Sequence, residues 1–230
     1  MPTINKVKAI VPNAKEARSY ICEVRAEQDA ERGAVIVGHP VVYDQDTILA
    51  KWGDEEIHEV IDRGAIDGKT DLKDVRFLVG HNTQMIPLAR SRNNNANSTM
   101  QLSPDENGLG FRANMDTENN MTARELYSAA GRGDITGMSF MFTIDKYGWE
   151  KADTNKPVRH IQHISRIFEI SACCFPAYEG TDLEIEAASE GNGLESLVAS
   201  LESERKKLAE ERAKANDRER RERALAIMRR

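Results

Sequence analysis

The stretch DITGMSFMFTIDKY, residues 134–147, decides the fold, because apolar and polar side chains alternate along it with the period of a β-strand. One face of such a strand carries Met138, Phe140, Phe142 and Ile144, and the other carries Ser139, Met141 and Thr143. One strongly apolar face is typical of a strand that covers a core on one side. The sequence therefore predicts a sheet protein with Ser139 on the polar face of a main strand.

Further strands are predicted on both sides of this stretch. Residues 18–26 and 33–44 are rich in β-branched side chains and predict a strand pair, and residues 74–81 predict a short buried strand that ends at His81. Residues 97–103 and 109–115 flank the turn cluster PDENG and predict a hairpin. Residues 158–175, VRHIQHISRIFEISACCF, predict one bent strand or two successive strands.

Two segments have helical periodicity instead. Residues 117–133 place Met121, Leu126, Ala129 and Ala130 on one predicted helix face, with a stop at Gly131 and Gly133. Beyond residue 182, leucines recur every seven residues at 194, 201 and 208, but glutamates stand at the partner positions 204 and 211. This pattern predicts a helix that is not a self-sufficient coiled coil, joined to the body by a hinge at Gly191 and Gly193.

Length and charge predict one folded body with a charged tail. The 230 residues suit one domain, which we expect over residues 18–182, between a flexible arm at 1–17 and a helical tail at 183–230. Seven acidic and no basic residues occur in 182–204, whereas 205–230 carries eleven basic and five acidic ones. The remainder is net acidic, which argues against specific binding of nucleic acid. No apolar run approaches the ~20 residues needed to cross a membrane, so we expect a cytoplasmic location.

Other polar residues are interpreted without a chemical role. The three cysteines, Cys22, Cys173 and Cys174, form no CxxC pair and are expected to be reduced. His160 and His163 with the adjacent cysteines match no common zinc spacing, so neither a metal nor a cofactor is predicted. A solvated loop is expected for the acidic residues Asp44, Asp46, Asp54, Glu55 and Glu56.

Residue patterns alone do not connect Ser139 with His81, since GMSFM lacks the second glycine of a nucleophile elbow. The connection comes from a resemblance that covers residues 18–182. Five segments resemble, in content, order and spacing, those of the prohead protease family of tailed phages. They are EVIDRGAID (59–67), DVRFLVGHNTQMIPLARS (74–91), ENGLGFRANM (106–115), ARELYSAAGRGDITGMSFMF (123–142) and RIFEISACCFPAYEGTD (166–182).

The resemblance implies an α+β, mainly β fold related to that of the herpesvirus assembly proteases: a small closed β-barrel of about six or seven strands with flanking helices. It makes residues 18–182 a serine protease domain in which Ser139 is the nucleophile and His81 the general base. Glu169 is implied as the third catalytic residue, with His163 as the rival candidate. Met141 departs from the glycine that is common in the family, which leaves the oxyanion site and substrate channel open.

The implied function is that of a serine endopeptidase of prohead maturation. Its expected partners are the major capsid protein, cleaved at its scaffolding segment, or a separate scaffold protein, and it is expected to cleave itself inside the assembling prohead. The tail would contact capsid subunits or be removed by self-cleavage, and a homodimer is expected by analogy. The alternatives are a catalytically inert scaffold protein of the same fold and a metal-dependent hydrolase.

Overall fold

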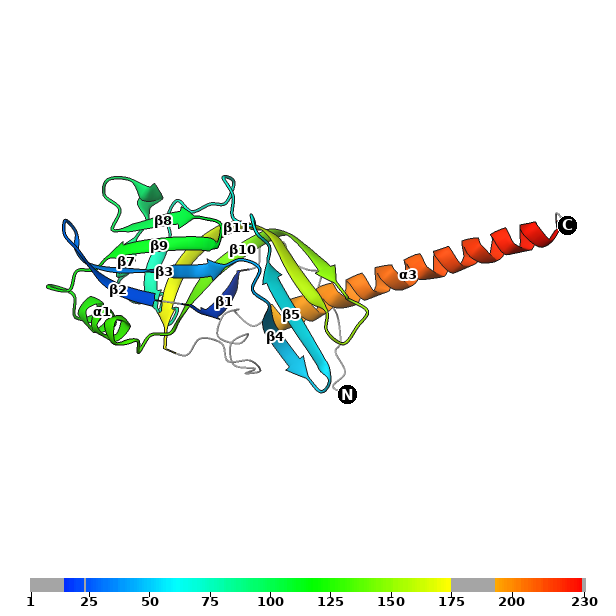
Figure 1. The fold of residues 1–230 in the computed structure, drawn as a ribbon, viewed down its shortest axis with the longest axis horizontal. Helices are drawn as coiled ribbons and strands as arrows, with labels where there is room; N and C mark the ends of the chain where they lie inside the picture. The colour runs from blue at the N-terminus through cyan, green and yellow to red at the C-terminus, as the bar shows by residue number, and fades with distance from the viewer. Residues whose placement is uncertain (1–14, 23, 175–192, 229–230) are drawn as a thin grey trace.

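The computed structural model describes residues 15–22, 24–174 and 193–228, which form two β-sheets, two α-helices and a 3-10 turn (Figure 1). The larger, seven-stranded sheet follows the order β1-β10-β11-β5-β4, and a branch of β6 and β7 pairs with β11. Its strands are β1 (Glu16–Ile21), β4 (Thr47–Trp52), β5 (Glu55–Ile61), β6 (Arg76–Val79), β7 (Ala89–Arg90), β10 (Gly137–Glu150) and β11 (Val158–Cys173).

The smaller sheet has the order β2-β3-β9-β8, all antiparallel. It consists of β2 (Val24–Asp29), β3 (Gly33–Val42), β8 (Met100–Pro104) and β9 (Gly108–Asn114), and the 3-10 turn η1 (Arg92–Asn94) precedes β8. The predicted hairpin is therefore confirmed as β8–β9. Residues 18–26 do not form one strand of a pair, because β1 joins β10 in the larger sheet and only β2 pairs with β3.

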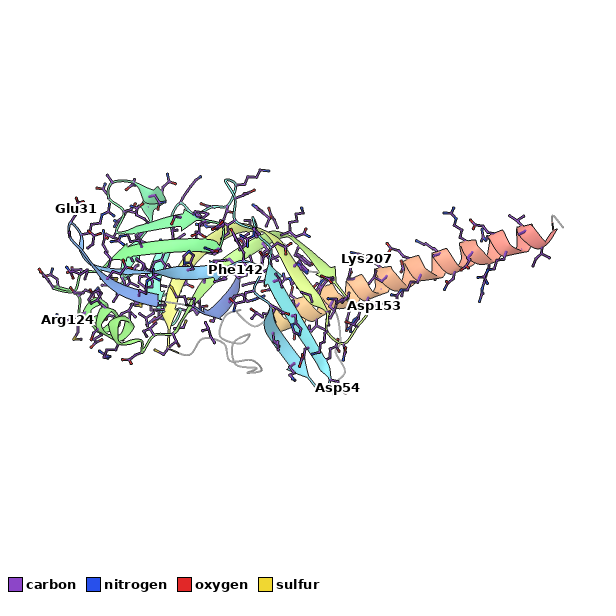
Figure 2. All side chains as sticks on the ribbon, viewed as in Figure 1. Glu31, Asp54, Arg124, Phe142, Asp153 and Lys207 are labelled. Atoms are coloured by element: carbon purple, nitrogen blue, oxygen red, sulfur yellow. The ribbon has the colours of Figure 1, made fainter. Side chains whose placement is uncertain are left out.

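The two sheets enclose one main apolar core. Phe140 and Ile170 from the larger sheet are fully buried with Ile36 from the smaller one. The rings of Phe77 and Phe111 meet across the sheets with centroids 5.2 Å apart. Phe142 lies in this interior, where its ring stacks on that of Phe140 (Figure 2). The apolar face expected for residues 138–144 thus packs into the main core.

A closed barrel was expected, and the sheets are not closed. The larger sheet ends at β1, at β4 and, on its branch, at β7, and the smaller one ends at β2 and β8. The reason lies in β11, which changes neighbours along its length. It pairs in parallel with β5 at residues 158–161 and with β6 at residues 169–172. The sheet therefore splays into two branches instead of curling back on itself.

Helix α1 (Met121–Arg132) covers the main core at one end of the molecule. The Asn120 side chain accepts a hydrogen bond from the Ala123 amide, and Gly133, at φ 76°, ends the helix in the left-handed conformation. The buried face is Ala123, Leu126 and Ala130. Met121 was expected on this face but lies in the first turn with 69% of its surface exposed.

The acidic segment around residue 55 is not a solvated loop. Strands β4 and β5 form a hairpin that turns at Gly53, where φ is 60°. Ala50 and Ile57 point from it into a second apolar cluster, together with Leu197 and Leu201 from the C-terminal helix. The charged residues of the hairpin obscured its apolar alternation, and the helix that covers it lies far along the chain.

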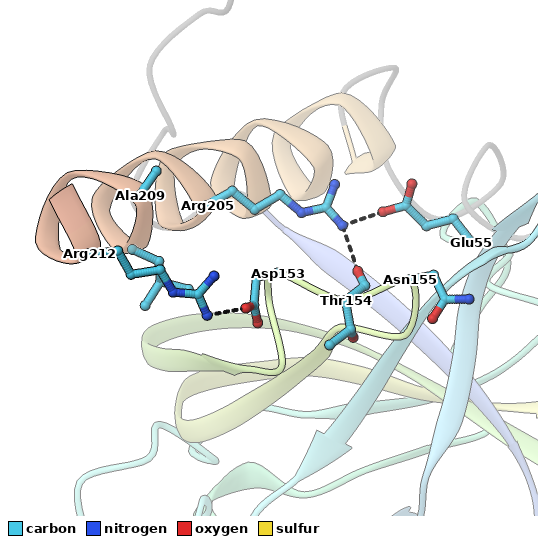
Figure 3. A pocket seen from close by; sticks show the side chains of 8 residues that line it. Glu55, Asp153, Thr154, Asn155, Arg205, Ala209 and Arg212 are labelled. Atoms are coloured by element: carbon cyan, nitrogen blue, oxygen red, sulfur yellow. Dashed lines mark hydrogen bonds and ion pairs between the residues drawn. The ribbon is translucent and has the colours of Figure 1, made fainter. Parts of the chain in front are cut away.

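The predicted C-terminal helix is present as α3 (Gly193–Met228), which projects far beyond the body (Figure 1). Its N-terminal half is anchored to the body, because Arg205 donates to the carbonyl of Thr154 at 2.9 Å (Figure 3). Arg205 also donates to the carbonyl of Ala152 at 2.6 Å. Arg212 pairs with Asp153 two turns farther on. Residues 209–227 of the helix are exposed. Residues 1–14 of the arm expected at 1–17 lie outside the described residues, whereas Glu16 and Ala17 belong to β1 and not to an arm. Of the expected hinge, Gly191 lies outside the described residues and Gly193 is the first residue of α3. Within those residues, neither helix is long and apolar enough to cross a membrane.

Candidate active site

Ser139 lies near the start of β10, between two neighbouring strands. The register places it opposite Ser19 of β1 and opposite Ser171 of β11. The core-facing side chains of Met138 and Phe140 are fully buried, and Ser139 on the other face is also 0% exposed. Its face of the sheet is therefore covered as well, which the strand pattern did not predict.

His81 follows β6, at the point where the chain leaves the sheet. Gly80 and His81 both have φ values of 57°, so two successive residues adopt the left-handed conformation. This conformation is unfavourable for a non-glycine residue and persists only where the surroundings enforce it. Here the Gly80 amide donates to the carbonyl of Ala172 at 3.1 Å, and the His81 amide donates to Ser171 Oγ at 3.0 Å. Strand β11 thereby turns the His81 ring back over the sheet.

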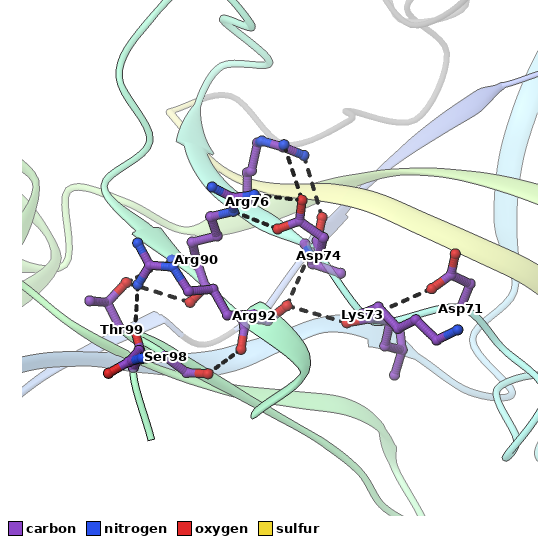
Figure 4. Close-up of polar contacts among 12 residues, drawn as sticks. Asp71, Lys73, Asp74, Arg76, Arg90, Arg92, Ser98 and Thr99 are labelled. Carbon is purple, nitrogen blue, oxygen red and sulfur yellow. Dashed lines mark hydrogen bonds and ion pairs between the residues drawn. The ribbon is translucent and has the colours of Figure 1, made fainter. Parts of the chain in front are cut away.

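An ion pair supports the start of β6. Asp74 accepts two hydrogen bonds from Arg90 of β7, at 2.5 and 2.8 Å, and a third from Arg76 at 3.2 Å (Figure 4). The hydrogen bonds from Arg90 lower the pKa of Asp74 against the smaller opposing effect of burial, and the positive charge of Arg76 lowers it further. The pairing joins β6 to β7 and helps to hold the strand that leads to His81.

Glu169 of β11 completes a line of three side chains. Its Oε1 lies 2.6 Å from His81 Nδ1, and His81 Nε2 lies 2.5 Å from Ser139 Oγ. Parallel pairing aligns residues 169–172 of β11 with residues 76–79 of β6, so Glu169 lies beside the strand that delivers His81. The Glu169 side chain is 4% exposed and that of His81 is 18% exposed. Carboxylate, imidazole and hydroxyl are joined in the order used by serine hydrolases.

The rival candidate His163 is not joined to His81. Its Nδ1 pairs with Asp145 and its Nε2 lies 3.2 Å from Asp67, so both ring nitrogens have other partners. The hydrogen bond with Asp145 raises the pKa of His163, and Asp67 adds to the effect against burial. His163 also precedes Glu169 by six strand positions, a separation of roughly 20 Å.

Two groups beside the site were missed by sequence reasoning. Ser171 Oγ donates to Glu169 Oε2 at 2.6 Å, and the hydroxyl of Ser139 is also directed at the carbonyl of Arg18, at 2.8 Å. Ser171 had a detectable signal, because residues two apart on a strand share a face. Arg18 had none, since its position depends on the pairing of β1 with β10.

Cys22 is disfavoured as a competing nucleophile. Cys22, Cys173 and Cys174 are free thiols. Burial raises the pKa of Cys22 to about 11, against weaker opposing hydrogen bonds, and this disfavours its reactive thiolate form. Ser139 is the hydroxyl that lies within hydrogen-bond distance of His81 Nε2.

Comparison with known proteins agrees with this geometry. A family model described as caudovirus prohead serine protease matches residues 21–195 of the 230. No curated protein and no solved structure matched the chain. The matched segment contains Ser139, His81 and Glu169, and it extends beyond the body to the first residues of α3. The chain belongs to the caudovirus prohead serine protease family.

Proposed function

We propose that this protein is a serine endopeptidase of phage prohead maturation, with Ser139 as nucleophile, His81 as general base and Glu169 as the group that orients His81. The observation that carries the proposal is the pair of hydrogen bonds that links the three side chains, at 2.6 and 2.5 Å. Family membership supports the same reaction class.

In the proposed reaction, Ser139 Oγ attacks the carbonyl carbon of a peptide bond while His81 Nε2 takes up the hydroxyl proton. The carbon–nitrogen bond then breaks, and His81 returns the proton to the departing amine, which leaves an acyl group on Ser139. Water attacks this ester in the same way and releases the acid. Glu169 accepts a hydrogen bond from Nδ1–H throughout, so Nε2 stays the basic nitrogen and the imidazolium is stabilised.

The proposed substrates are the scaffolding segment of the major capsid protein or a separate scaffold protein, with self-cleavage in addition. The reaction would take place inside the assembling prohead in the host cell, and the enzyme would act as a homodimer. An inert scaffold of the same fold is the alternative. It predicts the same binding to capsid subunits but no covalent reaction at Ser139.

Co-expression with the capsid gene encoded nearby tests the proposal. We expect the wild-type chain to shorten the capsid protein, as measured by the intact mass of both proteins, and Ser139→Ala to abolish this change. Ser165→Ala is the matched control, since Ser165 also lies on a strand of the larger sheet and makes a side-chain hydrogen bond, to Thr143. Processing by Ser139→Ala protein would show that the proposal is wrong.

A further inference from the structure

The edge of β10 beside Ser139 is occupied by the chain's own β1. The two strands pair antiparallel over six positions, from Glu16 opposite Phe142 to Ile21 opposite Gly137. Strand β1 ends the sheet and, among the described strands, pairs with β10 alone. One ladder of backbone hydrogen bonds therefore holds β1 in the sheet, and a peptide in extended conformation could form the same ladder in its place.

Strand β1 also blocks the nucleophile. Ser139 Oγ lies 2.8 Å from the Arg18 carbonyl oxygen, and Ser139 has no exposed surface. A peptide carbonyl must approach the attacking oxygen to about 3–3.5 Å before reaction. The Arg18 carbonyl of β1 already lies within this distance of Ser139 Oγ, so a substrate carbonyl on that side can approach only when β1 leaves.

A cluster of four charged residues holds the first half of β1. Arg18 lies 2.5 Å from Glu59 of β5, and Glu16 lies 2.8 Å from Arg159 of β11. Burial would raise the pKa of Glu16, but Arg159 and Arg18 outweigh this effect and lower it to about 2. We call these four residues the latch. Both of its contacts from β1 come from ionised side chains, so a charge-neutral variant weakens them selectively.

We propose that the edge of β10 beside Ser139 is the binding site for an extended peptide substrate, and that β1 is a removable occupant held by the latch. This inference rests on the proposed function. The protease is then inactive while β1 is paired with β10. Cleavage begins when a substrate segment displaces β1 and pairs with β10 as a new strand of the sheet.

A reversible disulfide tests whether β1 must move. Ala17 and Met141 face each other across β1 and β10, and such pairs have Cα atoms about 4.5–5.5 Å apart, which suits a disulfide. Ala17→Cys combined with Met141→Cys in the full chain is oxidised, mapped by peptide mass and treated with a fluorophosphonate that labels active serines. We expect no labelling of Ser139 when oxidised and labelling when reduced, with the two single variants as controls. Equal labelling of both forms would overturn the inference.

Weakening the latch should have the opposite effect to the disulfide, namely faster labelling of Ser139. Arg18→Gln should raise the rate of Ser139 labelling about tenfold, equivalent to about 1.4 kcal/mol. Arg112→Gln is the matched control, because Arg112 pairs with Glu27 and Asp29 away from β1, and it should leave the rate unchanged. An unchanged rate in folded Arg18→Gln protein would contradict the latch. If Ser139 is labelled neither in folded Arg18→Gln protein nor in the reduced double-cysteine variant, the proposed function itself is wrong.

Independently of β1, the geometry points to Ser171 as a positioning residue. It is fully buried and makes two hydrogen bonds, donating to Glu169 Oε2 at 2.6 Å and accepting from the His81 amide at 3.0 Å. One hydroxyl thus holds both the carboxylate and the left-handed backbone from which the imidazole projects. Ser171 would therefore act on the reaction through Glu169 and His81, without touching the substrate itself.

Ser171→Ala should lower kcat on a peptide substrate between about tenfold and a hundredfold, with KM unchanged, because it loosens the geometry without altering the peptide site. Ser165→Ala, on the same strand and with a comparable hydrogen bond, should leave kcat unchanged. A kcat loss no larger than that of Ser165→Ala at equal stability would contradict the role of Ser171. A rise in KM with constant kcat would contradict it as well.

Discussion

Replacing Glu59 with alanine removes the central anion of the latch. The Glu59 side chain is 0% exposed, and its oxygens lie 2.5 Å from Arg18 Nε and 3.2 Å from Arg159 Nη1. Among the described carboxylates that pair with them, Arg18 and Arg159 would then keep Glu16, and the Arg159 side chain is only 7% exposed. Breaking a buried ion pair from one side costs about 3–5 kcal/mol, because a charge stays buried without compensation. We expect the free energy of unfolding to fall by an amount in that range.

Urea unfolding, followed by circular dichroism, measures this loss. With a slope of about 2 kcal/mol per M, the expected shift of the midpoint is about 1.5–2.5 M. Glu56→Ala is the matched control, since Glu56 lies on the same strand but pairs with Lys51 and Lys156 near the surface. Its shift should be clearly smaller. If Glu59→Ala shifts the midpoint no more than Glu56→Ala does, the latch does not hold β1 to the sheet.

Three further predictions follow from the site and the tail. Glu169→Gln should lower kcat about 10²- to 10⁴-fold at an unchanged melting temperature, whereas His163→Ala should be mild; the reverse ranking would move the orienting role to His163. The lowered pKa of Glu16 contributes stability that is present above about pH 4.5 and is lost as the pH falls toward about 2, so the wild-type chain should lose more stability than Glu16→Gln over this interval in urea titrations at each pH. A chain ending after residue 213 should keep the packing of Leu201 and its activity on a short peptide but fail to enter proheads. A chain ending after residue 182 should likewise fail to enter proheads and should in addition melt at a lower temperature, because it loses the packing of Leu201. Normal packaging of the chain ending after residue 213 would show that the tail does not direct the protein into proheads.

Much of the local structure followed from the sequence. The alternation in residues 134–147, the turn cluster before Gly108 and the helical periods at 117–133 and beyond 194 each lie within one element, so local patterns report them. The resemblance in five segments also identified Ser139, His81 and Glu169 as the residues to examine. The expected closed barrel was wrong, because sheet closure depends on which strands meet.

Glu169 and His163 show what local patterns could not separate. Both lie on β11, and both are side chains that could orient a histidine. Only the parallel pairing of residues 169–172 with β6 places Glu169 beside His81, while His163 lies among Asp145 and Asp67. Pairing between segments about 90 residues apart made this choice.

The covering of Ser139 likewise depends on long-range contacts. The sequence by itself determined which strand carries the serine and that the strand has one apolar face. That Ser139 is also buried was decided by contacts from distant segments, namely His81 after β6 and the Arg18 carbonyl of β1, which lies more than 110 residues earlier in the chain. A strand's period reports the burial of its own side chains, whereas its neighbours are chosen by the whole sheet, and at this site they place a backbone carbonyl against the Ser139 hydroxyl.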